Sequence, residues 1–328
     1  MPYSELVGHE KQIETLKRAL ARNRMHHAYI FLGPEGVGKK TVALSLAMAI
    51  HCLERQDDFC GTCPNCVRIR NSNHPDVRLI RPEPGKKDIS IQQIRDLERE
   101  LNLRPFCGKK KIALLDPASL MNIAAQSALL KTLEEPPRDS LVILITTSTG
   151  ELLPTLISRC LRLSFSSLPS SLVMKFLVEQ KGIGPKDAEV LAAVSQGCPG
   201  KAISSAIEDF AEKRQAWIQK VSSLQAGDFK TVIELADDVS DDRDESLLFL
   251  EWMEGWLRDV LLHRVTESLQ GICNFDKADE IRKFAERYSL DGILFLRSKA
   301  LKTATAIRQN VNRRIALENL LCQVVRVQ

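Results

Sequence analysis

Residues 33–40 have the sequence Gly33-Pro34-Glu35-Gly36-Val37-Gly38-Lys39-Lys40, and this stretch decides the fold. Its spacing is that of a phosphate-binding loop, GxxxxGK[ST], in which backbone N–H groups hold the phosphates, the lysine reaches their oxygens and a hydroxyl binds Mg²⁺. Lys40 stands in place of that hydroxyl, and Thr41 follows one residue too late. A shifted register that uses Thr41 puts Lys39 and Pro34 at the glycine positions and loses the tight turn. The sequence predicts a phosphate-binding loop without its metal-binding hydroxyl.

The segments around this loop have the order that the motif requires. Ala28–Leu32 is a short apolar run that predicts a buried strand, and residues 41–49 form an apolar, alanine-rich stretch that predicts a helix. Similar patterns predict strands at 77–80, 111–116 and 141–147 and helices at 11–23, 91–103 and 123–133. Alternating strands and helices indicate a doubly wound α/β domain with a parallel sheet and its ligand at the carboxyl ends of the strands.

After Phe165 the sequence changes character, with long helical patterns and no convincing strand. Helices are expected at 172–182, 185–195 and 199–207, separated by glycine-containing turns. A further helical block runs from about residue 209 to the end. We therefore expect an α/β domain over 1–166, a small helical domain over 167–208 and an all-α domain over 209–328.

Composition places the chain among ordinary soluble globular proteins. It has 328 residues, 44% of them hydrophobic and 27% charged, which suits two or three domains. A net charge of +4 is too small to indicate a partner. Residues 1–5 lack the features of a secretion signal, and no apolar run approaches the length of a membrane span. We expect a cytoplasmic protein with no membrane partner.

Four of the nine cysteines are grouped in the pattern Cx7CxxCxxC, as Cys52, Cys60, Cys63 and Cys66. In a chain without a secretion signal, this spacing predicts thiolate ligands of Zn²⁺ rather than disulfides, the alternative being free thiols. Four thiolates leave no open coordination position, so the expected zinc site is structural. The remaining cysteines are scattered and mostly expected to be small core residues: Cys107, Cys160, Cys198, Cys273 and Cys322.

The end of the third predicted strand carries a second departure from an active ATPase. P-loop enzymes place an Asp there to help hold Mg²⁺, and many follow it with a Glu that polarises the attacking water. Asp116 is present, but Pro117 follows it and offers neither acid nor base. The metal-binding hydroxyl and the carboxylate are missing together, which argues against hydrolysis and against bound Mg²⁺.

Taken together, these motifs resemble those of bacterial clamp-loader subunits of the AAA+ class, and among them the delta prime family of the DNA polymerase III holoenzyme. The resemblance rests on the cysteine module at 52–66 and on strings that cover the first half densely: Val7-Gly8-His9, His27-Ala28-Tyr29-Ile30-Phe31-Leu32-Gly33-Pro34, Ala128-Leu129-Leu130-Lys131-Thr132-Leu133-Glu134-Glu135-Pro136-Pro137 and Ser158-Arg159-Cys160. Further on, 197–202 is similar to the family's second sensor and 314–321 to its last helix. The resemblance implies an AAA+ P-loop domain with an inserted zinc module, a helical lid and a C-terminal collar.

The resemblance also implies roles for individual residues. Arg159 would be an arginine finger presented to ATP in a neighbouring subunit, with Ser158 and Cys160 as positioning residues. Cys160 has no identifiable histidine partner and is not expected to be a nucleophile. Thr146 and Thr147 lie in the region of the first sensor, and Lys201 stands where the second sensor usually carries Arg. The vestigial pocket would consist of Gly33, Gly36, Gly38, Lys39, Lys40, Thr41, Asp116 and Lys201, and binding of ATP or ADP to it is left open.

The hypothesis that follows is a non-hydrolysing subunit of a pentameric clamp loader. It would assemble with gamma or tau and delta, and help to load the sliding clamp onto primed DNA as an accessory part of a DNA-directed DNA polymerase. One alternative is an autonomous gamma/tau-like ATPase that recruits Thr41. Another is a zinc-dependent DNA-binding module, which the aromatic content of 5% and the lack of a recognition-helix pattern disfavour.

Overall fold

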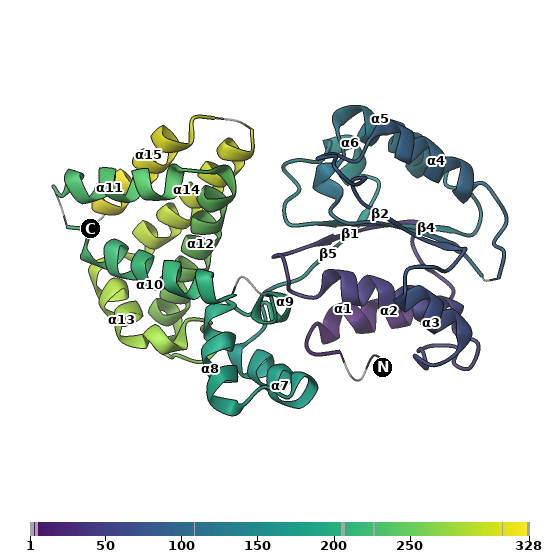
Figure 1. Cartoon of the computed structure of the whole chain (residues 1–328), viewed down its shortest axis with the longest axis horizontal. Helices are drawn as coiled ribbons and strands as arrows, with labels where there is room; N and C mark the ends of the chain where they lie inside the picture. The colour runs from purple at the N-terminus through teal and green to yellow at the C-terminus, as the bar shows by residue number, and fades with distance from the viewer. Residues whose placement is uncertain are drawn as a thin grey trace. The chain divides into compact units, whose positions relative to one another are not determined.

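The computed structural model describes residues 3, 6–107, 109–204, 207–225, 227–309 and 311–326, with only the backbone described for 207–209. The chain divides into two compact units, Met1–Ser167 and Leu168–Gln328. Figure 1 shows the first as a sheet covered by helices and the second as helices. The predicted α/β fold with a parallel sheet, followed by helical structure, is confirmed.

The first unit is built on five parallel strands in the order β2-β3-β4-β1-β5. The central strands have nearly continuous apolar sequences because both of their faces are covered, and all seven residues of β4 are buried. The strand bounds are β1 Ala28–Leu32, β2 Val77–Ile80, β3 Lys111–Leu115, β4 Ser140–Thr146 and β5 Leu161–Ser164.

Strand β5 was not predicted from the sequence. It lies at the edge of the sheet and pairs only with β1 among the described strands. Its sequence, Leu-Arg-Leu-Ser, is mostly exposed, and Leu161 itself is 44% exposed. The strand therefore lacks the apolar run that revealed the central ones.

Helices cover both faces of the sheet, with α1, α2 and α3 on one face and α4, α5 and α6 on the other (Figure 1). Local signals fix two of their starts: Ser90 and Gln93 form a capping box on α4, and Asn122 caps α5 by accepting from the Ala125 N–H at 2.9 Å. The bounds are α1 Glu10–Ala21, α2 Lys39–His51, α3 Pro64–Arg70, α4 Ile91–Leu101, α5 Ile123–Glu134 and α6 Pro154–Ile157, with a short 3₁₀ helix at Ala118–Leu120.

The second unit is helical throughout its described residues. The helix expected at 199–207 begins at Pro199 as predicted, but its predicted end is wrong, because α9 ends at Ala202 and the chain turns at Ile203 and Ser204. The bounds are α7 Ser170–Lys181, α8 Pro185–Val194, α9 Pro199–Ala202, α10 Ile207–Ser223, α11 Phe229–Ser240, α12 Arg243–Thr266, α13 Ala278–Arg287, α14 Leu290–Arg308 and α15 Arg313–Arg326, with a 3₁₀ turn at Phe275–Lys277.

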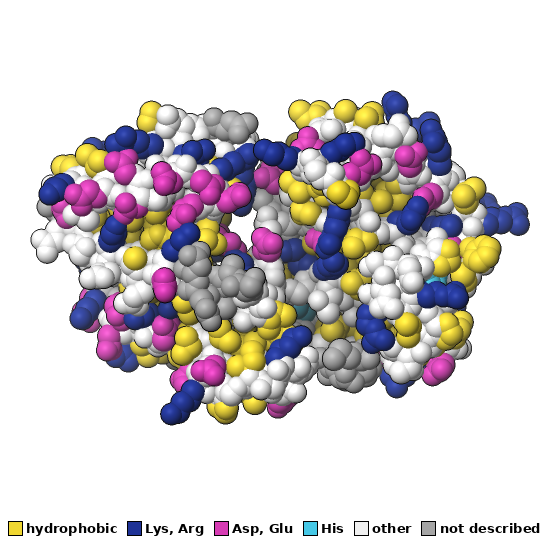
Figure 2. Space-filling view, viewed as in Figure 1, with side chains coloured by type: hydrophobic (Ala, Val, Ile, Leu, Met, Phe, Trp, Pro, Cys, Tyr) yellow, Lys and Arg dark blue, Asp and Glu magenta, His cyan; other side chains and the backbone are white. Residues whose placement is uncertain are grey.

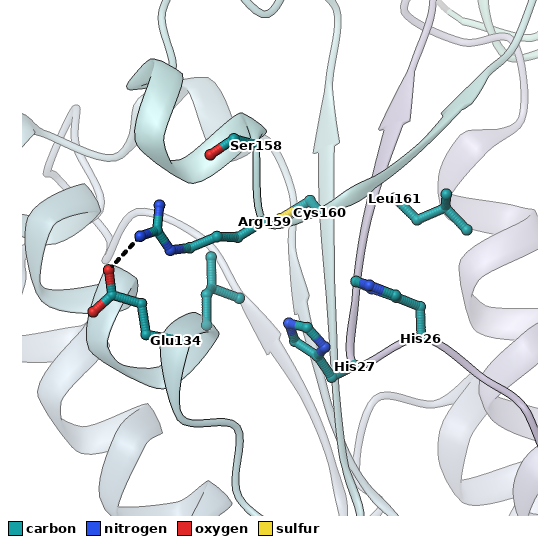
Figure 3. Close-up of a pocket in the computed structure, with 8 residues that line it drawn as sticks. His26, His27, Glu134, Ser158, Arg159, Cys160 and Leu161 are labelled. Carbon is teal, nitrogen blue, oxygen red and sulfur yellow. Dashed lines mark ion pairs between the residues drawn. The ribbon is translucent and has the colours of Figure 1, made fainter.

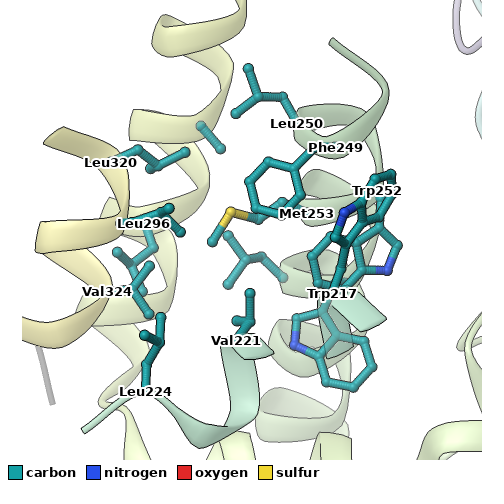
Figure 4. Close-up of a cluster of buried hydrophobic side chains, with 14 of the residues drawn as sticks. Trp217, Val221, Leu224, Phe249, Leu250, Trp252, Met253, Leu296, Leu320 and Val324 are labelled. Atoms are coloured by element: carbon teal, nitrogen blue, oxygen red, sulfur yellow. The ribbon is translucent and has the colours of Figure 1, made fainter. Parts of the chain in front are cut away.

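The core of the second unit is rich in aromatic side chains. Trp217, Phe249 and Trp252 lie against one another, with ring centroids 5.4 to 5.6 Å apart. Figure 4 shows this cluster beside Leu296 and Val324, which come from α14 and α15. Such burial of large rings supplies much of the apolar area that holds long helices together. None of the described helices is both long and apolar enough to cross a membrane.

Candidate functional site

The loop at 33–40 lies between a strand and a helix, as its sequence predicts. It joins β1 to α2, and Gly36 and Gly38 have φ angles of 74° and 112°, which favour glycine. Lys39 is buried, and its ammonium group donates to the carbonyl oxygens of Gly33 at 2.5 Å and Pro34 at 2.7 Å. The lysine of the motif therefore lies against the loop's own backbone.

The first glycine of the loop is also required by packing. A Cβ atom on Gly33 would lie 2.2 Å from the carbonyl oxygen of Phe165, just beyond β5. The Phe165 N–H donates to Leu32 O at 2.7 Å, and the Gly33 N–H donates to Thr146 O at 3.2 Å. Gly33 is thus needed where three neighbouring strands end, whether or not phosphate binds.

His9 braces the same loop and was not assigned a role from the sequence. Its Nε2 donates to the carbonyl oxygen of Val37 at 2.9 Å, and its ring packs edge-on against Phe165. Burial lowers the pKa of His9, with a backbone bond to Val37 acting in the opposite direction. The only sequence signal was its place in the string Val7-Gly8-His9.

The position of the metal-binding hydroxyl is filled by a cation that faces Asp116. Lys40 Nζ lies 4.0 Å from Asp116 Oδ2, and Arg81 Nη2 lies 3.3 Å from the same oxygen. Burial and the neighbouring Arg81 lower the pKa of Lys40, while Asp116 acts to raise it. Lys40 and Arg81 thus both lie beside Asp116, the carboxylate that an ATPase would use to bind Mg²⁺. The contact with Arg81 was not predicted from the sequence.

The other residues expected in the pocket lie on separate elements of the structure. Thr41 is exposed on α2, and the hydroxyl of Thr146 donates to Ser148 O at 2.6 Å. Thr147 follows the end of β4. Lys201 belongs to the second unit, where its ammonium group lies 2.6 Å from Glu251 Oε1 on α12.

Arg159 lies between α6 and β5, beside a cavity of about 450 Å³. Its Nη2 is 2.6 Å from Glu134 Oε1, and its Nη1 donates to Thr155 O at 2.8 Å. Figure 3 shows the guanidinium group directed at Glu134, at the end of α5. The cavity is lined by His26, His27, Leu133, Glu134, Ser158, Arg159, Cys160 and Leu161.

Ser158 and Cys160 flank Arg159 in the sequence. The Ser158 hydroxyl donates to Thr155 O at 3.0 Å. Burial raises the pKa of Cys160 to about 12, so its thiol stays protonated at neutral pH although His27 lines the same cavity. A protonated thiol does not favour nucleophilic chemistry at Cys160, and the positioning role expected for both residues stays a prediction.

Strand register separates Arg159 from the chain's own phosphate-binding loop. β1 and β5 are parallel neighbours in which Tyr29 pairs with Leu161 and Leu32 with Ser164. Extending this register puts Arg159 level with His27, six residues before Gly33. Six strand residues span about 20 Å, more than an arginine side chain can cross. Arg159 and the loop therefore lie at opposite ends of the sheet.

The four grouped cysteines come together in the structure. Their sulfur atoms all lie within 4.8 Å of one another, at the end of α2 and the start of α3, and three of the four residues are buried. Although burial opposes it, hydrogen bonds from Thr62 and Cys63 lower the pKa of Cys60 to about 6. Four sulfurs bound to one Zn²⁺ would lie about 3.8 Å apart, so this cluster fits a metal ion with little adjustment.

The chain is similar to known subunits of bacterial DNA polymerase III. Residues 8–169 match the family described as DNA polymerase III, delta subunit, and 208–326 match its C-terminal family. DNA polymerase III subunit delta' of Bacillus subtilis is 36% identical over 62% of this chain and 60% of that relative. Subunit delta' of Pseudomonas aeruginosa is 29% identical over 90% of this chain and 91% of that relative. DNA polymerase III subunit tau of B. subtilis is 28% identical over 87% of this chain and 54% of that relative.

Proposed function

Because the chain belongs to the delta prime family of bacterial DNA polymerase III clamp-loader subunits, we propose that it is a subunit that assists clamp loading without hydrolysing ATP itself. In this function it supplies Arg159 to the ATP of a neighbouring subunit, while the complex places the sliding clamp on primed DNA. Its partners are gamma or tau and delta in a ring of five. In such a ring, residues 167–208 act as the lid and 209–328 as the collar.

The observation that carries this proposal is the separation of Arg159 from the loop. The side chain of Arg159 is 35% exposed and lies at the opposite end of the sheet from Gly33. A planar, permanently charged guanidinium group suits the γ-phosphate oxygens of a nucleotide. Since the chain's own loop is out of reach, the phosphate that it serves belongs to another subunit.

The surroundings of the loop support the absence of hydrolysis. Asp116 already faces Lys40 and Arg81, so we expect no Mg²⁺ there, and Pro117 supplies no base. Lys201 is paired with Glu251 rather than left free to sense phosphate. Nucleotide analysis of the purified complex would establish whether ATP or ADP is bound.

The cysteine cluster completes the proposal with a structural Zn²⁺ held by Cys52, Cys60, Cys63 and Cys66. The ion would supply a cross-link between the end of α2 and the start of α3 and would take no part in hydrolysis. Its donors are four sulfurs, which leave no position for water or substrate.

Two measurements test the proposal against a gamma/tau-like ATPase, which the likeness to tau and the intact loop shape favour. The first is steady-state ATP hydrolysis by the isolated chain, with and without primed DNA, for which we expect no turnover above background. The second is co-purification, for which we expect gamma or tau and delta. Turnover of about 1 s⁻¹ or more by the isolated chain would reject the proposal.

A further inference from the structure

The string that ends in Glu134-Glu135-Pro136-Pro137 is part of the resemblance but has no role so far. In the structure, the string forms the C-terminal part of α5 up to Glu134, and its last three residues follow the helix. Glu134 lines the same cavity as His27 and as Ser158-Arg159-Cys160. Three strings from distant parts of the sequence thus line one cavity, and of them Glu134 contacts the Arg159 side chain (Figure 3).

The guanidinium group of Arg159 is held from two directions. Glu134 Oε1 lies 2.6 Å from Nη2, and the backbone carbonyl of Thr155 accepts from Nη1 at 2.8 Å. Arginine carries five N–H donors in a rigid fork, so donors remain available for phosphate oxygens while these two contacts fix the plane. Thr155 belongs to the adjoining helix α6, whereas Glu134 belongs to α5, which is distant in the sequence.

We propose that Glu134 is a positioning residue for Arg159, an inference that rests on the proposed role of Arg159 as an arginine finger. A free arginine loses much rotamer freedom when it binds, and a partner that holds it beforehand reduces that loss. The pair is half-exposed, with 35% of the Arg159 side chain and 51% of the Glu134 side chain accessible. Such a pair is weak enough for the guanidinium group to exchange a hydrogen bond for a phosphate oxygen.

The matched control is the next residue. Glu135 is exposed and has the same charge, but it makes no ion pair with a described residue. Comparing Glu134→Gln with Glu135→Gln therefore separates the contact with Arg159 from the loss of one negative charge. Glu134→Asp keeps the charge one methylene further away and should recover part of the effect.

The experiment measures DNA-stimulated ATP hydrolysis by complexes of this chain with gamma or tau and delta. Arg159→Ala should lower kcat at the ATP site that receives Arg159 by about 10³-fold or more. Glu134→Gln should lower kcat by about three- to tenfold, with KM for ATP changed by less than about twofold, and Glu135→Gln should have no effect. In the Arg159→Ala background, Glu134→Gln should cause no further loss, because nothing remains to be positioned.

Each failure has its own signature. A normal rate with Arg159→Ala overturns the proposed function and this inference with it. A low rate with Arg159→Ala but a normal or raised rate with Glu134→Gln overturns the inference alone. The isolated chain gives a readout that needs no partner. The Nη–H NMR signals of Arg159 should move toward those of exposed arginines in Glu134→Gln, because Nη2 is the atom that contacts Glu134, and unchanged signals would also overturn the inference.

Discussion

Asp76 offers the sharpest test of how the first unit is held together. Asp76 immediately precedes β2 beside the start of β3, and its side chain is completely buried. Its two carboxylate oxygens accept from the backbone N–H groups of Phe106 and Cys107, each at 2.8 Å, and Oδ1 lies 3.0 Å from Lys111 Nζ. One carboxylate therefore anchors the loop after α4 to the start of β3, although Phe106 itself is 84% exposed.

Replacing Asp76 with Asn removes the charge and leaves one of the three donors without a good acceptor. The Lys111 side chain is only 12% exposed, so its ammonium group loses its counter-ion where water is scarce. Breaking a buried pair from one side costs about 3 to 5 kcal/mol, and the partial exposure of Lys111 places the expected cost near the lower value. We predict that Asp76→Asn lowers the free energy of unfolding of this unit by about 3 kcal/mol.

Native-state amide exchange of β3 measures this loss directly. We expect the β3 amides to exchange roughly a hundredfold faster in Asp76→Asn, while amides of α12 in the other unit serve as an unchanged internal control. The double variant Asp76→Asn with Lys111→Met should be more stable than Asp76→Asn alone, because no unpaired charge remains. An acceleration below about fivefold, or a double variant less stable than the single one, would refute the reasoning.

The pH dependence of the same difference has a definite sign. Burial alone would raise the pKa of Asp76, but the two backbone donors and Lys111 outweigh it and lower the pKa. A lowered pKa contributes stability above the unfolded value of about 3.9, and this stability is lost as the pH falls through the folded value. The difference between the wild type and Asp76→Asn should therefore be constant near neutrality and shrink below about pH 4.

Three further predictions concern the loop and the cysteines. Gly33→Ala should destabilise the first unit by about 1 to 3 kcal/mol in the same exchange experiment, because its Cβ would lie 2.2 Å from Phe165 O. Unchanged exchange rates would show that the backbone at Phe165 can move away at little cost. Cys63→Ser should reduce bound zinc, measured by elemental analysis, from about one ion per chain to well below one, whereas Cys322→Ser should retain it; equal zinc in both would exclude the cluster. Lys40→Thr should leave the isolated chain without ATP turnover, since Pro117 still provides no base, and measurable hydrolysis would show that Lys40 was the only obstacle.

Most strands of the sheet could be predicted from the sequence because the central strands are buried on both faces. β1 and β4 have apolar residues at almost every position, and helix α4 combines regular spacing with a capping box. Strand β5 could not be recognised, since an exposed edge strand has no continuous apolar run. The stretch after Ala202 continues with residues compatible with a helix, yet the chain turns there, which local propensity does not specify.

The candidate sites also differ in whether their residues are close together in the sequence. Spacing alone grouped the four cysteines, because CxxC patterns bring sulfurs together locally. The partners of Asp116 and Arg159 come from elsewhere: Arg81 lies 35 residues before Asp116, and Glu134 lies 25 residues before Arg159. Such pairs depend on how strands and helices are arranged in space, so a single sequence indicates neither of them.

In the proposed function, this chain acts through Arg159 on a neighbour's ATP and not through its own loop. The most direct measurement compares Arg159→Ala with Thr41→Ala in the assembled complex, using DNA-stimulated ATP hydrolysis as the readout. Thr41 is exposed on α2, and an autonomous ATPase would have to use its hydroxyl to bind Mg²⁺. We predict a loss of about 10³-fold or more for Arg159→Ala at the ATP site that receives Arg159, and an unchanged rate for Thr41→Ala. A normal rate with Arg159→Ala and a large loss with Thr41→Ala would contradict the claim.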